Sequence, residues 1–384
     1  MEHDIEIPPT WNRTEWAREM YRWRKQHEHI VGYSVDDIRL PETISIGDLE
    51  LRKFQPNPML KAPSHLLERA KFPVVDVHTH LIDANVEEVI RGMDTLNIEK
   101  AVNLTGGVEH HLDETLGKLD RAYPDRFATF STPDFRKRCG PEFGERAAAQ
   151  LEADVAKGAK GLKILKVLGL YARDEEGNLL AVDSALFDPL WAKAAELNLP
   201  VMLHVGDPPA FFEPPNHANE RYVELTNHPE WYYPQDTYPR LETILEQRDN
   251  VFKRHPNTSF ICAHMANTTH DLARLASMLD TFPNVHVEIS AQINELGRQP
   301  YTAREFFLKY QDRVLFGTDN IGDALSPPHY RLYFRFLETA DEYFPFSPEA
   351  EGQGWWRIYG LYLPDDVLEK VYYLNAKKMI PGID

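Results

Sequence analysis

The chain has 384 residues, of which 42% are hydrophobic and 27% charged, as is ordinary for a globular protein with a large core. Its 42 basic and 60 acidic residues give a formal net charge of −18, which disfavours nucleic acid and anionic membranes as partners. No apolar run approaches the roughly 20 residues that cross a bilayer, the N-terminus lacks the apolar core of a signal peptide, and Cys139 and Cys262 form no Cys-x-x-Cys pair. We therefore expect a cytoplasmic protein that acts on a small molecule.

The first 71 residues differ from the rest of the chain. Trp11 to His27 is predicted as a charged helix that carries aromatic residues, and the alternation from Ile44 to Leu51 predicts a short hairpin arm. Four prolines between positions 56 and 73 then interrupt regular structure before the first apolar run. We predict that residues 1–71 form an extension that packs on the main domain and is not a separate catalytic unit.

Residues 72–384 are predicted as one domain in which short apolar runs alternate with amphipathic helices. The predicted strands are Val74–His80, Lys100–Thr105, Phe127–Thr132, Gly161–Leu165, Val201–Val205, Ser259–His264, Val285–Ile289 and Val314–Thr318. Eight strands, each followed by a helix, over roughly 250 residues are typical of a (β/α)₈ TIM barrel. A doubly wound open sheet is the alternative, but the first strand-to-helix turn lacks its Gly-x-Gly-x-x-Gly fingerprint.

Several helices have predicted starts. Asn85 followed by Glu88 has the spacing of a capping box, and so does Thr302 followed by Glu305. The dipeptide Asp188-Pro189 predicts a cap followed by proline in the first helical position.

Two stretches rich in aromatic residues interrupt this alternation, one at 207–239 after the fifth strand and one at 341–363. Long loops in compact domains are often lids or binding loops. His228, Trp231 and Tyr232 in the first stretch are therefore candidates for contacting a substrate, and a packed lid remains the alternative for them. Arg221 in the same stretch is a candidate clamp for a substrate carboxylate, with a surface arginine as the alternative.

Polar residues end several of the predicted strands, where the active sites of barrels form. His78 and His80 are two positions apart, so they share one face of the first strand and can bind one cation together. His204, His264 and Asp319 end the fifth, sixth and eighth strands. A single buried histidine is commonly a core residue whose hydrogen bonds are satisfied. The placement of histidines at three strand ends and a carboxylate at a fourth is much harder to obtain by chance.

These residues suit a divalent cation that is borderline between hard and soft. His78, His80, His204 and Asp319 offer three imidazoles and one carboxylate, the ligands that Zn²⁺ prefers and Mn²⁺ accepts, with room for water or substrate. Water bound to such an ion loses its proton near neutral pH. His264 is close enough along the rim to act as an acid, a base or an electrophile, or to be a ligand itself.

The order of these motifs resembles the amidohydrolase superfamily, most closely the amidohydrolase-related branch that includes aminocarboxymuconate semialdehyde decarboxylase and γ-resorcylate decarboxylase. The resemblance covers about residues 72–384. It is carried by His78-Thr79-His80, Lys163, His204, His264 and Gly317-Thr318-Asp319, and supported by Met93–Val102, Tyr123–Phe127, Gly158–Lys163 and Asn375-Ala376. The chain departs from the branch at Ala266 and Asn267, because a glycine often follows the sixth-strand histidine there.

The resemblance implies one divalent ion, Zn²⁺ in the first place and Mn²⁺ as the alternative, held by His78, His80, His204 and Asp319. It implies that His264 is catalytic, that Asp319 also accepts a proton, and that the protein is a homodimer. Lys163 is carboxylated and bridges two metals in some members, but we favour a lysine that is paired with a carboxylate or contacts the substrate.

Our first functional interpretation is a metal-dependent hydrolase of a lactone, an amide or a related small substrate, using metal-activated water. The alternative on the same site is a non-oxidative decarboxylase of an aromatic or unsaturated carboxylic acid. It would need a cation that holds the substrate carboxylate. A non-catalytic binding protein is a third interpretation, which the convergent ligand set disfavours.

Overall fold

The computed structural model describes residues 23, 25–31, 58–136, 138–347 and 353–383. The chain divides into two units, Met1–Pro56 and Asn57–Asp384. In the first unit the described helix is α2 (Glu28–Val31). The predicted arm at Ile44–Leu51, and most of the predicted helix at Trp11–His27, lie outside the described residues, so the packing of this extension stays a prediction.

The second unit is built on parallel strands that form two hydrogen-bonded groups, in the orders β3-β2-β1-β9 and β4-β5-β6-β7-β8. The strands are β1 (Val74–Leu81), β2 (Ile98–Asn103), β3 (Phe127–Thr129), β4 (Leu162–Ile164), β5 (Pro200–Leu203), β6 (Ser259–Cys262), β7 (Val285–Glu288), β8 (Val314–Leu315) and β9 (Asn320–Gly322). β9 continues the line of β8 and pairs with β1, so the two together serve as the eighth strand.

Two further contacts close the ring. A parallel bridge between Ser131 and Leu162 joins the segment after β3 to β4. On the other side, the Val77 amide donates to the Phe316 carbonyl at 3.0 Å, which joins β1 to the segment after β8. The prediction of a (β/α)₈ barrel is therefore confirmed.

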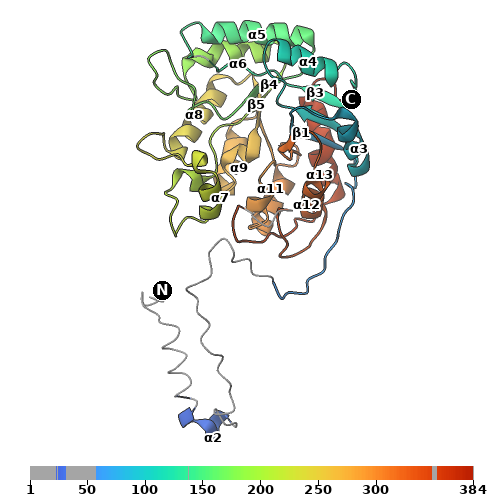
Figure 1. Ribbon diagram of the computed structural model, residues 1–384, viewed down its shortest axis with the longest axis vertical. Helices are drawn as coiled ribbons and strands as arrows, with labels where there is room; N and C mark the ends of the chain where they lie inside the picture. Colours follow the sequence, from blue (N-terminus) through green and yellow to red (C-terminus); the bar gives the residue numbers. More distant parts are fainter. Residues whose placement is uncertain (1–22, 24, 32–57, 137, 348–352, 384) are drawn as a thin grey trace. The chain divides into compact units, whose positions relative to one another are not determined.

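Helices surround the strands in Figure 1. The longer ones are α3 (Val86–Leu96), α4 (His110–Lys118), α5 (Phe143–Lys157), α6 (Asp188–Glu196), α8 (Leu241–Arg254), α9 (Leu272–Thr281), α11 (Pro300–Lys309) and α12 (Pro327–Glu338). The shorter ones are η4 (Ala185–Phe187), η5 (Pro209–Phe212), α7 (Tyr222–Asn227), η6 (Pro229–Trp231), η7 (Ala263–Asn267), α10 (Ile293–Leu296), α13 (Asp365–Glu369), η8 (Lys370–Leu374) and α14 (Asn375–Met379). None of the described helices is long and apolar enough to cross a membrane.

Of the three predicted helix starts, two are confirmed in position, and one of these also in its cap. The Asn85 side chain accepts from the Glu88 amide at the start of α3. α6 begins at Asp188 with a proline in its first turn, as predicted, but its N-cap is Phe187 and the Asp188 carboxylate pairs with Arg254 and His255. α11 begins at Pro300, before Thr302.

The core has two parts. Residues inside the barrel form a small cluster that ends against α14, and a larger cluster fills the space between the strands and the outer helices. The inner cluster comprises Val75, Val77, Val102, Leu104, Ala128, Phe130, Met202, Ile261, Ala263, Leu315, Ala376, Ile380 and Ile383. This packing closes one end of the barrel, so a site must form at the other end.

The first strand carries an irregularity that matters for the site. Its pairing with β2 shifts register between Asp76 and Thr79. Val77 faces the barrel interior, yet His78 next to it also points into the barrel, whereas Asp76 is turned outward and accepts from the Tyr330 hydroxyl of α12 at 2.6 Å. Irregularities of this kind redirect a side chain that strict alternation would point elsewhere.

The segment before β1 is tied to the barrel unit. Asp341 accepts from the His65 amide at 2.7 Å and from Arg335 Nε at 2.6 Å. Lys71 Nζ pairs with Asp365 at 2.6 Å. Residues 58–71, which we assigned to the extension, therefore contact the barrel.

Candidate metal centre

The polar strand ends converge at one end of the barrel. His78 and His80 lie at the end of β1, and Asp319 follows β8 with a φ of 60°. This left-handed conformation lets the Asp319 amide donate to the His78 carbonyl at 2.8 Å, which brings the two side chains together.

Three atoms form a tight triangle. His78 Nε2 lies 3.2 Å from His80 Nε2 and 3.4 Å from Asp319 Oδ1, and His80 Nε2 lies 3.1 Å from the same oxygen. His264 joins this group, because ligand atoms of His78, His264 and Asp319 all lie within 4.8 Å of one another.

The hydrogen bonds at Nδ1 decide which nitrogen of each imidazole carries the proton. His78 Nδ1 lies 2.9 Å from the Glu288 carboxylate, which can only accept, so Nδ1 carries the proton and Nε2 offers a lone pair. His80 Nδ1 lies 3.3 Å from Thr105 Oγ1, whose own proton goes to Asn103 Oδ1. The Thr105 hydroxyl therefore accepts from His80, and His80 Nε2 also offers a lone pair.

The pKa shifts of His78 and Asp319 also bear on whether these groups can bind a metal ion. Burial, assisted by the nearby Lys163 ammonium, holds the pKa of His78 well below its usual range. Burial opposes ionisation of Asp319, but positive charge among the surrounding imidazoles, that of His78 first, holds its pKa well below the usual value. With a bound cation supplying that positive charge, His78 would be neutral and Asp319 ionised, the forms in which these groups bind metal.

These observations fit a bound cation. Two lone pairs and a carboxylate oxygen lie 3.1–3.4 Å apart with no proton assigned between them. Two ligand atoms about 2.1 Å from one tetrahedral ion are separated by roughly 3.4 Å, so the spacing is that of a metal site. His78, His80 and Asp319 would hold the ion.

His204 is placed differently from the other predicted ligands. Its ring packs on the His264 ring, with centroids 4.3 Å apart, and its Nε2 is buried without a hydrogen-bond partner among the described residues. Asp207 Oδ1 lies 3.7 Å from that nitrogen. A buried imidazole nitrogen without a hydrogen-bond partner is what a metal ligand would show without its ion. The group of ligand atoms within 4.8 Å of one another, however, contains His264 and not His204. The predicted role of His204 as a ligand therefore stays a prediction.

Glu288, at the end of β7, connects two of these histidines. Its Oε1 accepts from His78 Nδ1 at 2.9 Å, from the His264 amide at 2.8 Å and from Ser290 Oγ at 2.8 Å. The His264 Nδ1–H in turn donates to the Ser290 carbonyl at 2.9 Å, which leaves His264 Nε2 for the site. Gly317 makes room for this carboxylate, because a Cβ atom there would lie 2.3 Å from Glu288 Oε2.

Replacing Glu288 with glutamine is expected to weaken metal binding roughly 10- to 100-fold, the usual cost of losing the partner that orients a ligand imidazole. The amide group would also face the Ser290 amide, which now donates to Glu288 Oε2 at 2.6 Å. Calorimetric titration with Zn²⁺ or Mn²⁺ measures the affinity. The matched control is Glu338→Gln, which removes a carboxylate bound to Tyr372 on an outer helix. Equal affinity in Glu288→Gln and wild type would contradict the role assigned to Glu288.

Lys163 on β4 is the cation nearest to the triangle. It is fully buried, and its Nζ lies 3.4 Å from His78 Nε2. Burial lowers its pKa to about 8, and the nearby carboxylates of Asp319 and Glu288 oppose that shift. An ammonium group is therefore available at neutral pH directly beside the candidate metal centre.

The residues predicted to contact substrate lie in the stretch after β5. Arg221 is buried and pairs with Glu224 at 2.8 Å and with Glu295 at 2.6 Å, so its guanidinium is already engaged. Trp231 stacks between His228, with centroids 4.0 Å apart, and Phe211 at 5.7 Å. Tyr232 is partly buried against the core. These contacts describe a packed lid, and substrate contact by any of the four stays a prediction.

Asp207 links this lid to the site, a connection the sequence did not reveal. Its carboxylate accepts from Lys166 Nζ and from the Tyr233 hydroxyl, each at 2.7 Å. The sequence does show a second polar residue just after the last polar residue of two strands: Asp207 stands three residues after His204, and Ser290 two residues after Glu288. This spacing is the signal in the sequence that could have indicated Asp207 and Ser290.

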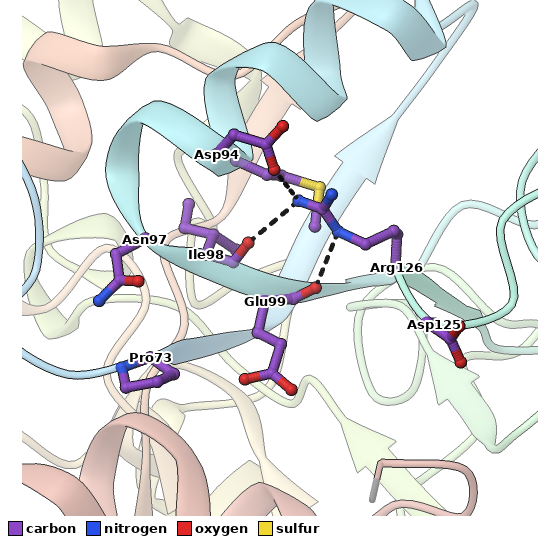
Figure 2. A pocket seen from close by; sticks show the side chains of 8 residues that line it. Pro73, Asp94, Asn97, Ile98, Glu99, Asp125 and Arg126 are labelled. Carbon is purple, nitrogen blue, oxygen red and sulfur yellow. Dashed lines mark hydrogen bonds and ion pairs between the residues drawn. The ribbon is translucent and has the colours of Figure 1, made fainter.

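Two cavities lie outside this cluster. One, of about 140 Å³, lies beyond β5, β6 and β7 and is lined by Arg221, Asn267, Gln292 and Glu295, among others. The other, of about 420 Å³, lies at the opposite end of the strands, where Arg126 binds Asp94 and the carbonyls of Ile98 and Glu99 (Figure 2). The second is far along the strands from the polar cluster, so it is not part of the candidate centre.

The sequence profile described as amidohydrolase matches residues 75–382. A comparison with curated proteins found no match. The solved structure of 2,6-dihydroxybenzoate decarboxylase from Rhizobium is similar with a TM-score of 0.51 at 16% identity, covering 80% of this chain and 98% of that one.

Two further structures are similar to the same extent. The complex of 2,6-dihydroxybenzoate decarboxylase with 2,6-dihydroxybenzoate has a TM-score of 0.52 at 16% identity and covers 80% of this chain and 98% of that one. An uncharacterized TIM-barrel protein from Bordetella bronchiseptica has a TM-score of 0.50 at 16% identity with the same coverage. At this identity the likeness shows a shared fold.

Proposed function

The chain belongs to the amidohydrolase family, and on that basis we propose that it is a metal-dependent, non-oxidative decarboxylase of a small aromatic or unsaturated carboxylic acid. The observation that carries this proposal is the buried ammonium of Lys163 beside His78. A hydrolase of neutral lactones or amides needs no buried cation there, whereas a decarboxylase must hold an anion. The shared fold with 2,6-dihydroxybenzoate decarboxylase supports the same choice.

The charges of the site also suit a monocarboxylate. Lys163 and Glu288 balance each other, so a divalent ion beside the ionised Asp319 leaves one net positive charge. A buried site of this kind binds a single carboxylate better than a neutral ester, because buried charges are stable only when paired. We propose one Zn²⁺, or Mn²⁺ as the alternative, held by His78, His80 and Asp319, with His204 completing the set.

The residues of the site have separate roles in this proposed reaction. The bound ion would supply a Lewis acid for the substrate carboxylate and an adjacent oxygen. Lys163 holds the second carboxylate oxygen. His264 acts in its doubly protonated form: its Nδ1–H stays on the Ser290 carbonyl, and its second proton, on Nε2, passes to the ring carbon that bears the carboxylate, which leaves the imidazole neutral. The bond between that carbon and the carboxylate then breaks, its electron pair returns to the ring, and CO₂ leaves.

The test is a panel of hydroxybenzoates and lactones incubated with metal-loaded protein. We expect CO₂ release from at least one hydroxybenzoate, with 2,6-dihydroxybenzoate as the first probe. In D₂O the product should carry one deuterium at the carbon that lost the carboxylate. Lactone opening without CO₂ release would instead establish the hydrolase, and elemental analysis of the purified protein would identify the ion.

A further inference from the structure

The turn directly after β6 has an unusual backbone. φ is 56° at His264, 52° at Met265, 58° at Ala266 and 49° at Asn267. None of these residues is glycine, and residues with a Cβ atom enter the left-handed region only at a cost, because Cβ approaches the following carbonyl oxygen. Such a run persists only where the surrounding structure holds it.

A buried arginine holds the middle of this turn. Arg248 on α8 is 1% exposed, and its Nη1 donates to the Ala266 carbonyl at 2.6 Å and to Thr268 Oγ1 at 3.4 Å. Its Nε and Nη2 both donate to Asp249 Oδ1, at 3.0 and 2.7 Å, which fixes the plane of the guanidinium. The reaction proposed above gives this buried charge no part, so its role must come from the turn.

The two ends of the turn are held as well. Glu288 accepts from the His264 amide at 2.8 Å at the start. Asn267 Nδ2 donates to the Val205 and Gly206 carbonyls, each at 3.0 Å, and so ties the end of the turn to the segment after β5. With these anchors, His264 Nδ1 reaches the Ser290 carbonyl and its other nitrogen faces the metal centre.

We propose that Arg248 is a positioning residue: by binding the Ala266 carbonyl it keeps the turn left-handed and thereby aims the His264 imidazole at the metal centre. The described hydrogen bonds of Arg248 end on the turn and on Asp249, so it acts on His264 through the turn and not by direct contact. The inference rests on the proposed function for what His264 does, but not for how the turn is held.

The experiment compares the full-length Arg248→Met variant with wild type by hydrogen–deuterium exchange of the peptide that contains residues 262–269. We expect exchange in the turn to be about tenfold faster, because the turn opens more often. With 2,6-dihydroxybenzoate as the probe, kcat should fall roughly 10- to 100-fold, since a misplaced catalytic group costs rate. KM and metal stoichiometry should stay within about twofold, because neither the metal centre nor substrate binding is changed.

A second substitution tests the backbone argument itself. Glycine has no Cβ and enters the left-handed region freely, so Ala266→Gly should relieve the conformational cost that Arg248 offsets. Compared with Arg248→Met, the double variant Arg248→Met/Ala266→Gly should therefore regain most of the protection of the turn against hydrogen exchange and most of the lost kcat. Arg248→Lys keeps a buried cation and one donor to the Ala266 carbonyl, so exchange in the turn and kcat should lie between those of wild type and Arg248→Met. If the methionine variant does not fold, Arg248→Lys is compared with Arg248→Lys/Ala266→Gly, and the glycine should bring exchange and kcat back towards wild type.

The matched control is Arg126→Met, which also removes an arginine that binds backbone carbonyls, at the opposite end of the barrel (Figure 2). It should leave exchange in the turn at the wild-type rate. The proposal is overturned if Arg248→Met exchanges at the wild-type rate, or if Ala266→Gly restores neither protection nor kcat. If no carboxylic acid is decarboxylated, the proposed function fails, and the exchange data alone still decide how the turn is held.

Discussion

Replacing His78 with alanine is expected to abolish both stoichiometric metal binding and turnover. His78 Nε2 makes two of the three contacts of the triangle, lying 3.2 Å from His80 Nε2 and 3.4 Å from Asp319 Oδ1. Without it the remaining groups cannot surround one ion, and affinity should fall well beyond the roughly 10- to 100-fold that follows loss of a mere orienting partner. Elemental analysis and titration with Zn²⁺ or Mn²⁺ measure the loss without any substrate.

The control for this variant is His255→Ala. His255 is a partly buried histidine that pairs with Asp188 at 2.9 Å, before β6 and away from the strand ends that carry the cluster. It should retain full metal content. Full occupancy in His78→Ala would remove the basis of the ligand assignment, and with it the proposed reaction.

Replacing Lys163 with methionine is expected to lower kcat/KM for a carboxylate substrate roughly 10- to 100-fold, since a hydrogen bond to a charged group contributes about 1.5–3 kcal/mol. Methionine fills a similar volume without the charge, so the loss reports on the ammonium. The matched control is Lys100→Met, which removes another buried lysine from a strand, one whose Nζ donates to the Pro124 carbonyl at 3.3 Å. Unchanged kcat/KM in Lys163→Met would count against decarboxylation.

The Lys163→Met variant should also have a higher free energy of unfolding than wild type in the metal-free form. Burial lowers the pKa of Lys163 to about 8 from a usual 10.5, so the unfolded chain binds this proton more tightly than the folded one. The resulting penalty, on the order of 3 kcal/mol, is fully present below pH 8 and disappears as pH rises to about 10.5. Denaturant unfolding should show the advantage of Lys163→Met at pH 7 and its loss near pH 10.5. A constant difference across this window would contradict the buried ammonium.

The parts of the fold that the sequence predicted are those that depend on local pattern. All eight predicted strands overlap observed ones, because buried parallel strands are short apolar runs that the flanking helices separate. The Asn85 cap was found because a side chain and an amide three residues apart meet whatever the rest of the protein does. The helix predicted to start at Asp188-Pro189 does begin at Asp188, but the Asp188 side chain pairs with Arg254 and does not cap it. The start at Thr302 was wrong, because α11 begins two residues earlier, at a proline.

Two features of the site could not be predicted from residues that are neighbours in the sequence. The register shift in β1 turns Asp76 away from His78, although alternation would put both on one face. The left-handed turn at His264 depends on Arg248 and Glu288, which lie on other elements. Arg221 was a candidate clamp by residue type, but the structure shows its charge engaged by the nearby Glu224 and by the distant Glu295.

The sequence by itself determined which residues end the strands, because the period of side chains along a strand and the apolar runs are properties of the chain alone. That was enough to place His78, His80, His204, His264 and Asp319 on one rim of a barrel. Only the tertiary structure decided that His264 lies within the tight group and His204 beside it, and that the ammonium of Lys163 is buried at its edge. Proton positions, burial and charge arise from contacts between residues far apart in the chain, so they exist only once the barrel has closed.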